Sequence, residues 1–172
     1  MKQFLKVVFG IVILAGVLYG IYIVVPEYPH NMIKSFIQPI TDAHAKMRIE
    51  QVQNMSVGIK ELEGLTYKMA VEKNTGMSCW VYEQDELTGN EVVKYYGKGA
   101  AINLKDFPDY NGKLYTGAVV KFEFVISGNN VEILPYVDGV KMNITGGASK
   151  ERNKEILKSI VSQMYSGMQP DQ

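Results

Sequence analysis

The stretch KLYTGAVVKFEFVISGNNVEILPYV, residues 113–137, decides the fold of this 172-residue chain. Apolar and polar residues alternate in its first half, which is the period of a strand with one buried face. The segment SGNN then combines residue types that reverse a chain between two strands. The apolar residues that share one face of the first arm are Val120, Phe122, Phe124 and Ile126. The stretch therefore predicts a long β-hairpin.

Segments upstream of the hairpin also have strand character. Residues 65–71 alternate between larger apolar side chains and polar or small ones, and MSCWVYE, EVVKYY and GAAINL follow as runs rich in β-branched and aromatic residues. The turns between them are too short to hold crossover helices, so the strands should pair in antiparallel fashion. Together with the hairpin they predict an antiparallel sheet of about five strands. The single Cys79 lies in one of these segments, where we expect a small buried hydrophobe.

The segment from Ser149 to Ser166 has the pattern of an amphipathic helix. Gly167 stands at the C-cap position that follows it. The apolar stripe consists of Ile156, Leu157, Ile160, Val161 and Met164. We expect this helix to cover one face of the sheet, which makes the fold class α+β, with a domain over residues 56–168 and a flexible tail over 169–172.

Residues 1–25 are predicted to form a transmembrane signal-anchor helix. The run from Val7 to Val25 contains 19 uncharged, mostly apolar residues, which as a helix span about 28 Å and match a hydrocarbon core of about 30 Å. No A-x-A-like cleavage site follows the run, so an anchor is favoured over a cleaved signal peptide, which would release a secreted protein. Lys2 and Lys6 precede the run and Glu27 follows it, which predicts a cytoplasmic N-terminus and a C-terminal domain outside the cytoplasm.

Two glycines in this run suggest a route to self-association. Gly16 and Gly20 form a G-x-x-x-G pair, a spacing that lets two transmembrane helices approach closely. Glycine is also common in membrane-spanning helices that do not associate. The pair is therefore a candidate helix-packing site, and a monomeric anchor is the alternative.

Residues 26–55 are predicted to form a juxtamembrane helical connector. Residues 31–37 carry the apolar pattern of a short amphipathic helix, which is compatible with a position on the membrane surface. Pro39 suits the first turn of a second helix that runs to about Asn54. This second helix is either a stalk or an element packed against the domain.

Composition makes several functional classes unfavourable. Beyond Lys2 and Lys6 the chain has two more acidic than basic residues, which argues against nucleic acid as a partner. With one cysteine there is no intramolecular disulfide. The only histidines, His30 and His44, precede the sheet, which argues against a nucleophile–histidine triad and against structural zinc. We predict no metal and no cofactor.

Aromatic residues crowd the middle of the chain, and several lie at the edges of predicted loops. Exposed Tyr and Trp rings offer rigid contact area to a partner, although core packing explains the same composition. The candidate ligand or partner surface consists of Trp80, Tyr82, Tyr95, Tyr96, Tyr110 and Tyr115. Glu123 and Glu132 lie on opposite arms of the hairpin, where a suitable register would bring two carboxylates together for acid and base catalysis.

The leading functional expectation is a single-pass, membrane-anchored binding or assembly module without catalytic activity, located outside the cytoplasm. Its partner is expected to be the membrane together with another envelope protein or a second copy of the chain. The alternatives are a small extracytoplasmic enzyme that uses carboxylates and a secreted binding protein formed by signal cleavage. The chain is thus more consistent with a binding protein than with an enzyme.

Overall fold

A computed structural model describes residues 27–107, 110, 112–143 and 149–167 of the chain. Within these ranges there are four α-helices, one short 3-10 helix and five strands. The helices are α2 (Glu27–Thr41), α3 (Ala43–Gln53), α4 (Tyr67–Glu72) and α5 (Ser149–Ser166), with the 3-10 helix at Lys60–Leu62. The strands are β1 (Met77–Gln84), β2 (Glu91–Asn103), β3 (Leu114–Ser127), β4 (Asn130–Val137) and β5 (Val140–Lys141).

The strands form one antiparallel sheet in the order β1-β2-β3-β4-β5, so every strand pairs with its neighbour in the sequence. The predicted α+β class, the five-stranded antiparallel sheet and the C-terminal helix are confirmed. In the central hairpin, Ser127 pairs with Asn130, and Gly128 has φ +61° at the first position of the two-residue turn. A positive φ at that position is typical of a type II′ turn, which glycine adopts without strain.

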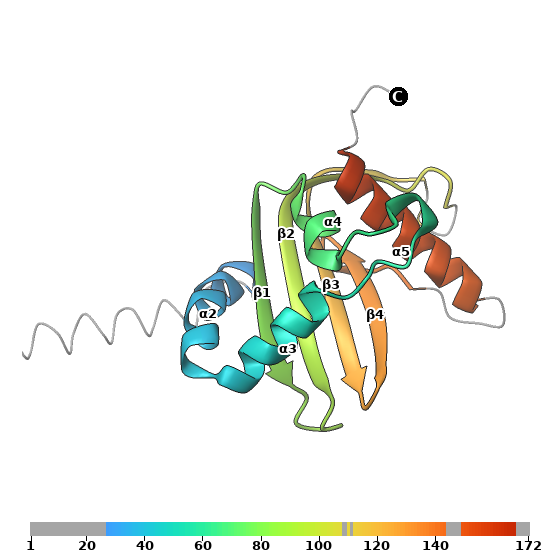
Figure 1. Cartoon of the computed structure of the whole chain (residues 1–172). Helices are drawn as coiled ribbons and strands as arrows, with labels where there is room; N and C mark the ends of the chain where they lie inside the picture. Colours follow the sequence, from blue (N-terminus) through green and yellow to red (C-terminus); the bar gives the residue numbers. More distant parts are fainter. Residues whose placement is uncertain (1–26, 108–109, 111, 144–148, 168–172) are drawn as a thin grey trace, which may run out of the picture.

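One face of the sheet carries the main core. Helices α3, α4 and α5 lie over this face (Figure 1), and their buried residues join the inward side chains of the strands in one cluster. Phe122 and Phe124 of β3 are fully buried there, as the alternation in the opening stretch predicts. Because Ile49 and Val52 of α3 are also buried, α3 is packed against the domain, which decides between the two alternatives for the second connector helix.

The opposite face of the sheet is only partly covered, by α2 beside β1 (Figure 1). Met32 of α2 packs against Cys79, Val81 and Tyr96 on this face. The expectation that Cys79 is a buried hydrophobe is confirmed, since its side chain lies in this cluster and burial raises the pKa of its thiol to about 12.

The strand predicted over residues 65–71 is wrong, because most of this segment is helix α4. Thr66 caps the helix by accepting a hydrogen bond from the backbone N–H of Met69. Tyr67 and Val71 are buried, while Met69 is 55% exposed. Positions i and i+4 belong to the period of a strand and to that of a helix alike, so the alternation in the sequence could not separate the two structures.

Two other boundaries also differ from the prediction. EVVKYY and GAAINL belong to the single strand β2, whose register shifts around Ala100, next to Gly99 with φ +97°. Helix α2 continues through Pro39 to Thr41, and Asp42 caps α3 by accepting from the N–H of Ala45. The second connector helix therefore begins four residues after Pro39, at a residue type with higher N-cap preference.

None of the described helices is long and apolar enough to cross a membrane. The predicted anchor over residues 1–25, with Gly16 and Gly20, lies outside the described residues, and so does the predicted tail over 169–172.

Candidate binding site at the β4 edge

Five of the six aromatic residues that we considered as a partner surface lie in the interior. Trp80, Tyr82, Tyr95, Tyr96 and Tyr115 are between 0% and 8% exposed, and Tyr110 is half-buried at the edge of the core. The rings of Trp80 and Tyr95 pack with their centroids 4.8 Å apart. Their polar atoms are satisfied inside the fold: Trp80 Nε1 donates to Glu72 over 2.6 Å, and the Tyr95 hydroxyl donates to the Val71 carbonyl over 2.7 Å. Core packing therefore accounts for these residues.

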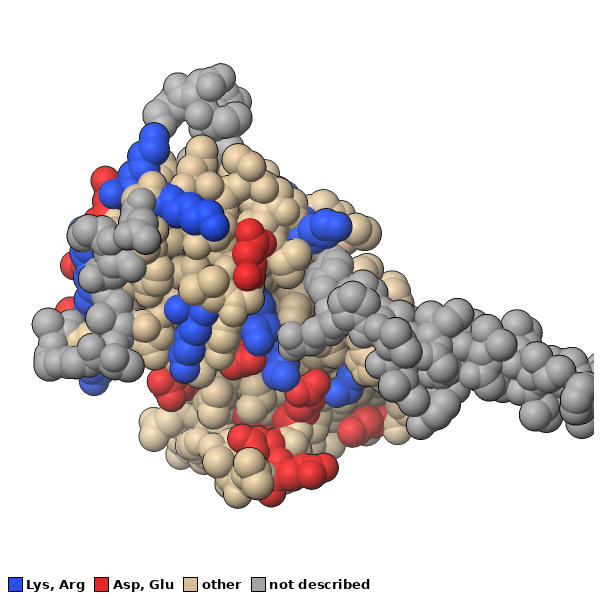
Figure 2. All heavy atoms as spheres, turned by 180° about the vertical axis from the view of Figure 1, so that it is seen from behind, with Lys and Arg blue, Asp and Glu red and all other residues tan. Residues whose placement is uncertain are grey.

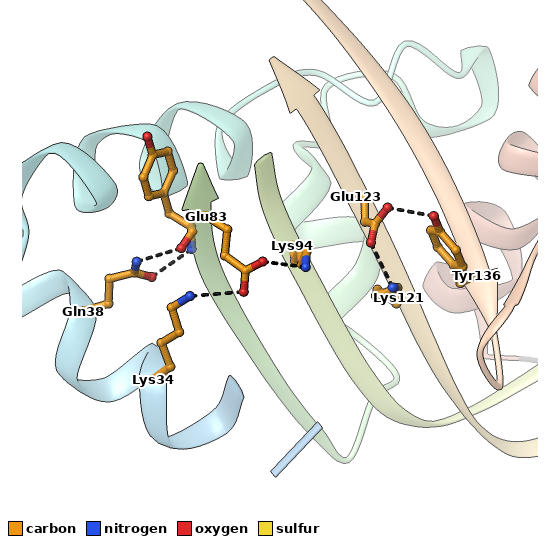
Figure 3. A network of polar contacts seen from close by, with 8 residues as sticks. Lys34, Gln38, Glu83, Lys94, Lys121, Glu123 and Tyr136 are labelled. Carbon is orange, nitrogen blue, oxygen red and sulfur yellow. Dashed lines mark hydrogen bonds and ion pairs between the residues drawn. The ribbon is translucent and has the colours of Figure 1, made fainter. Parts of the chain in front are cut away.

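A row of charged side chains crosses the opposite face of the sheet (Figure 3). Lys34 of α2 and Lys94 of β2 both bind the carboxylate of Glu83, at 3.1 and 2.6 Å. Farther along the row, Glu123 accepts from Lys121 Nζ at 2.9 Å and from the Tyr136 hydroxyl at 2.7 Å. Seen from behind, this side of the molecule carries positive and negative side chains close together (Figure 2). The charges in the row satisfy one another, which indicates a structural role.

The two candidate catalytic carboxylates, Glu123 and Glu132, do not lie directly opposite each other on the hairpin. The register places Val125 opposite Glu132 and Leu134 opposite Glu123, so both carboxylates project from the same face at diagonal positions. Glu123 lines a small cavity beside β1 and β2, whereas Glu132 lines a different groove beside α5. Burial alone would raise the pKa of Glu123, but hydrogen bonds from Lys121 and Tyr136 and the nearby Lys94 charge together lower it. A general acid needs the opposite shift.

A third polar cluster, which sequence reasoning missed, joins α3 to the start of β2. Glu91 accepts hydrogen bonds from His44, from Arg48 and, over 3.0 Å, from the Tyr82 hydroxyl. Burial would raise the pKa of Glu91, yet these hydrogen bonds outweigh burial and lower it. His44 and Arg48 lie one helical turn apart, which is the signal that could have indicated a shared partner. The partner itself is 43 residues beyond Arg48.

The two edges of the sheet differ. At β1 the side-chain amide of Gln38 from α2 imitates a neighbouring strand: its Nε2 donates to the Tyr82 carbonyl over 2.7 Å, and its Oε1 accepts from the Tyr82 N–H over 2.8 Å (Figure 3). Helix α2 thus covers this edge and satisfies backbone groups that would otherwise face outward. The β1 edge is closed at this position.

The edge of β4 is paired over only part of its length. Short β5 pairs with Val137, and the N–H of Met142 donates to the carbonyl of Pro135 over 2.8 Å. The N–H of Asp138 donates to the carbonyl of Val119, so the backbone groups of Asp138 point toward β3. Along an antiparallel strand, the N–H and C=O groups of successive residues point alternately toward and away from the neighbouring strand. By that alternation Val131 and Ile133 point their N–H and C=O groups away from β3. No hydrogen bond to these outward groups is found within the described part of the chain.

A groove runs along this open edge. It has a volume of about 1060 Å³ and is lined by residues 131–135 of β4, by Met142 and Asn143, and by the first turns of α5 up to Leu157. The side-chain oxygen Oδ1 of Asn143 is buried and has no hydrogen-bond partner among the described residues. Lys150 and Lys154 of α5 also line the groove. The groove is thus lined by the unbonded backbone groups of Val131 and Ile133, by the side-chain oxygen of Asn143 and by apolar side chains.

Metal chemistry has no candidate site here, because no group of three or more potential His, Cys, Asp or Glu ligands occurs among the residues described. The β4 edge was not foreseen from the sequence. Pro135 was its available signal, since proline within a sheet is confined to edges, strand starts and bulges.

Comparison with protein-family models, with curated proteins and with solved structures found no match to this chain.

Proposed function

We propose that this chain is a non-enzymatic binding or assembly module, tethered outside the cytoplasm by residues 1–25, that binds an extended strand of a partner polypeptide at the β4 edge. The observation that carries the proposal is the set of outward N–H and C=O groups of Val131 and Ile133 beside an open groove. An added strand satisfies such groups by continuing the sheet, and its side chains enter the adjacent groove.

We expect a partner strand to bind the β4 edge with modest affinity, to which its side chains contribute. Four backbone hydrogen bonds at about 1 kcal/mol each amount to about 4 kcal/mol, which the loss of translational and rotational freedom on association largely offsets. One apolar side chain buried against Met142 and Leu157 adds about 1.5–3 kcal/mol. A donor aimed at Asn143 Oδ1 removes the cost of a buried, unpaired acceptor. Confinement of both partners to one membrane raises their effective concentration and makes such an affinity sufficient.

The anchor part of the proposal is supported by the sequence of residues 7–25, which is uncharged and long enough to cross a bilayer. The Gly16 and Gly20 pair supplies a second route to self-association within the membrane. N-terminal sequencing of the mature chain distinguishes a retained anchor from a released, secreted form.

The test is site-specific photo-crosslinking of the full chain in its native membrane. A benzoylphenylalanine probe at Lys150, in the wall of the groove, should capture a partner, and the same probe at Lys46 on α3 is the control outside the groove. Peptide mapping should place the crosslink in an extended segment. The mass of the adduct distinguishes another envelope protein from a second copy of the chain.

A pair of variants connects any captured partner to the β4 edge. Ile133→Pro removes an N–H that faces away from β3, as Pro135 already does in the same strand, and also shortens a side chain packed against the core, whereas Ile133→Val keeps that N–H. The proline variant should lose the crosslink and the valine variant should keep it, while circular dichroism shows that both variants remain folded. Crosslinks that survive in Ile133→Pro, or that form equally from Lys46, would contradict the proposal.

A further inference from the structure

Helix α2 is oriented against the usual amphipathic rule. A surface helix normally turns its apolar stripe toward the core and its polar side toward water. In α2 the apolar stripe points away from the protein: Ile33, Phe36, Ile37 and Ile40, at positions i, i+3, i+4 and i+7, are 43%, 71%, 54% and 85% exposed.

The polar side of α2 is the side that binds the domain. Asn31 is only 3% exposed, Gln38 forms two hydrogen bonds with the backbone of β1, and Lys34 forms an ion pair with Glu83 (Figure 3). The two contacts come from Lys34 and Gln38, which lie one turn apart, and the buried Asn31 lies one turn before Lys34 on the same face of the helix. The polar contacts of Lys34 and Gln38, together with the packing of Met32 against the sheet, therefore set the orientation of α2. The larger apolar stripe faces outward as a consequence.

The position of α2 in the chain indicates what covers this stripe. The uncharged apolar run of residues 7–25 ends two residues before Glu27, where α2 begins. We infer that the stripe of Ile33, Phe36, Ile37 and Ile40 lies in the lipid interface of the bilayer, so that α2 docks the domain on the membrane surface through its β1 side. A helix with this pattern lies in the interface plane, with its apolar side chains among the headgroups and upper acyl chains.

This docking defines the orientation of the sheet relative to the bilayer. The β1 edge then lies nearest the bilayer, and β4 lies three strand spacings farther along the sheet, about 14 Å away. Figure 1 shows α2 and β4 at opposite sides of the sheet. The inference rests on the membrane anchoring in the proposed function, and it adds that the open β4 edge faces away from the lipid.

The test measures the depth of spin labels in the bilayer, using the full chain reconstituted at one copy per phosphatidylcholine nanodisc. Labels are attached in Phe36→Cys and Ile40→Cys, with Lys46→Cys on α3 as the water-exposed control. The native Cys79 is buried and its thiol pKa is raised to about 12, so the parent chain should take up no label.

Labels at positions 36 and 40 should collide with dissolved oxygen but lose collisions with a hydrophilic nickel chelate, relative to the label at position 46. If all three labels collide equally with the chelate in discs that retain the chain, the docking is overturned while the anchor stands. If the chain does not remain with the lipid, the anchor and the docking are both overturned. Protection that appears only with two copies per disc would assign the stripe to a second copy and overturn the lipid assignment.

Discussion

The side chain of Gln38 makes two hydrogen bonds to the backbone of Tyr82, and both cross from a helix to the edge of a sheet. We expect Gln38→Ala to leave these part-buried backbone groups without partners and to lower the free energy of unfolding by about 1–3 kcal/mol. Chemical denaturation measures this change, and Gln84→Ala, at an exposed position of β1, is the control. An equal effect of both substitutions would show that the edge contact contributes nothing specific.

Acid should destabilise the protein through the carboxylates of the charged row. The pKa of Glu123 in the folded protein lies below its ordinary value of 4.5, so the unfolded chain binds more protons in acid. The stabilisation by Glu123 is therefore complete above about pH 4.5 and is lost as the pH falls through the folded pKa.

Glu123→Gln should accordingly flatten the dependence of unfolding free energy on pH below 4.5. Urea denaturation at a series of pH values measures the slope. The matched control Glu132→Gln removes an exposed carboxylate on the adjacent strand and so measures the effect of losing one surface charge. The same slope in Glu123→Gln and in the parent would contradict the assignment.

At the scale of elements, helix α3 belongs to the folding unit. Ile49→Ala should lower the free energy of unfolding by about 2–5 kcal/mol, because it leaves a cavity among α3, α4 and β1 where Ile49 is 6% exposed. Met47→Ala, at a position of the same helix that is 51% exposed, should change it far less. A small effect at both positions would indicate a stalk that is only loosely attached.

The sequence predicted those elements whose pattern fits one period. Phe122 and Phe124 alternate over a long strand, and the stripe of α5 repeats from Ile156 to Met164, so the hairpin and the C-terminal helix were recognised. The short α4 was mistaken for a strand, since six residues with buried Tyr67 and Val71 fit both periods. For helices, periodicity indicates which face is apolar but not which face packs, and α2 is the case where the two differ.

The candidate site was harder to predict than the fold. The aromatic composition suggested a surface, but burial depends on tertiary contacts that a single sequence does not contain. The β4 edge depends on strand order and on where β5 stops, and both are properties of the assembled sheet. Pro135 was the one local signal of an edge strand in this part of the sequence.

The whole molecule combines a β1 edge that α2 covers at Tyr82, an open β4 edge and an outward apolar helix. In the docking that we infer, the β1 edge faces the bilayer and the open β4 edge is available to the proposed partner. Open edges invite unwanted pairing, and this one is short: within the described residues, β5 and Pro135 leave unbonded outward backbone groups of β4 only at Val131 and Ile133. A short edge limits aggregation and still allows a strand to be added.

The contrast between the two edges is the central claim, and residue-resolved amide hydrogen exchange of the full chain tests it most directly. The amide of Tyr82, bonded to Gln38, should exchange slowly, while those of Val131 and Ile133 should exchange much faster than those of Glu132 and Leu134, which face β3. Fast exchange at alternate residues of β4 together with protection at Tyr82 is the predicted result. Equal protection of Ile133 and Leu134 would mean that the β4 edge is already covered and would contradict the account.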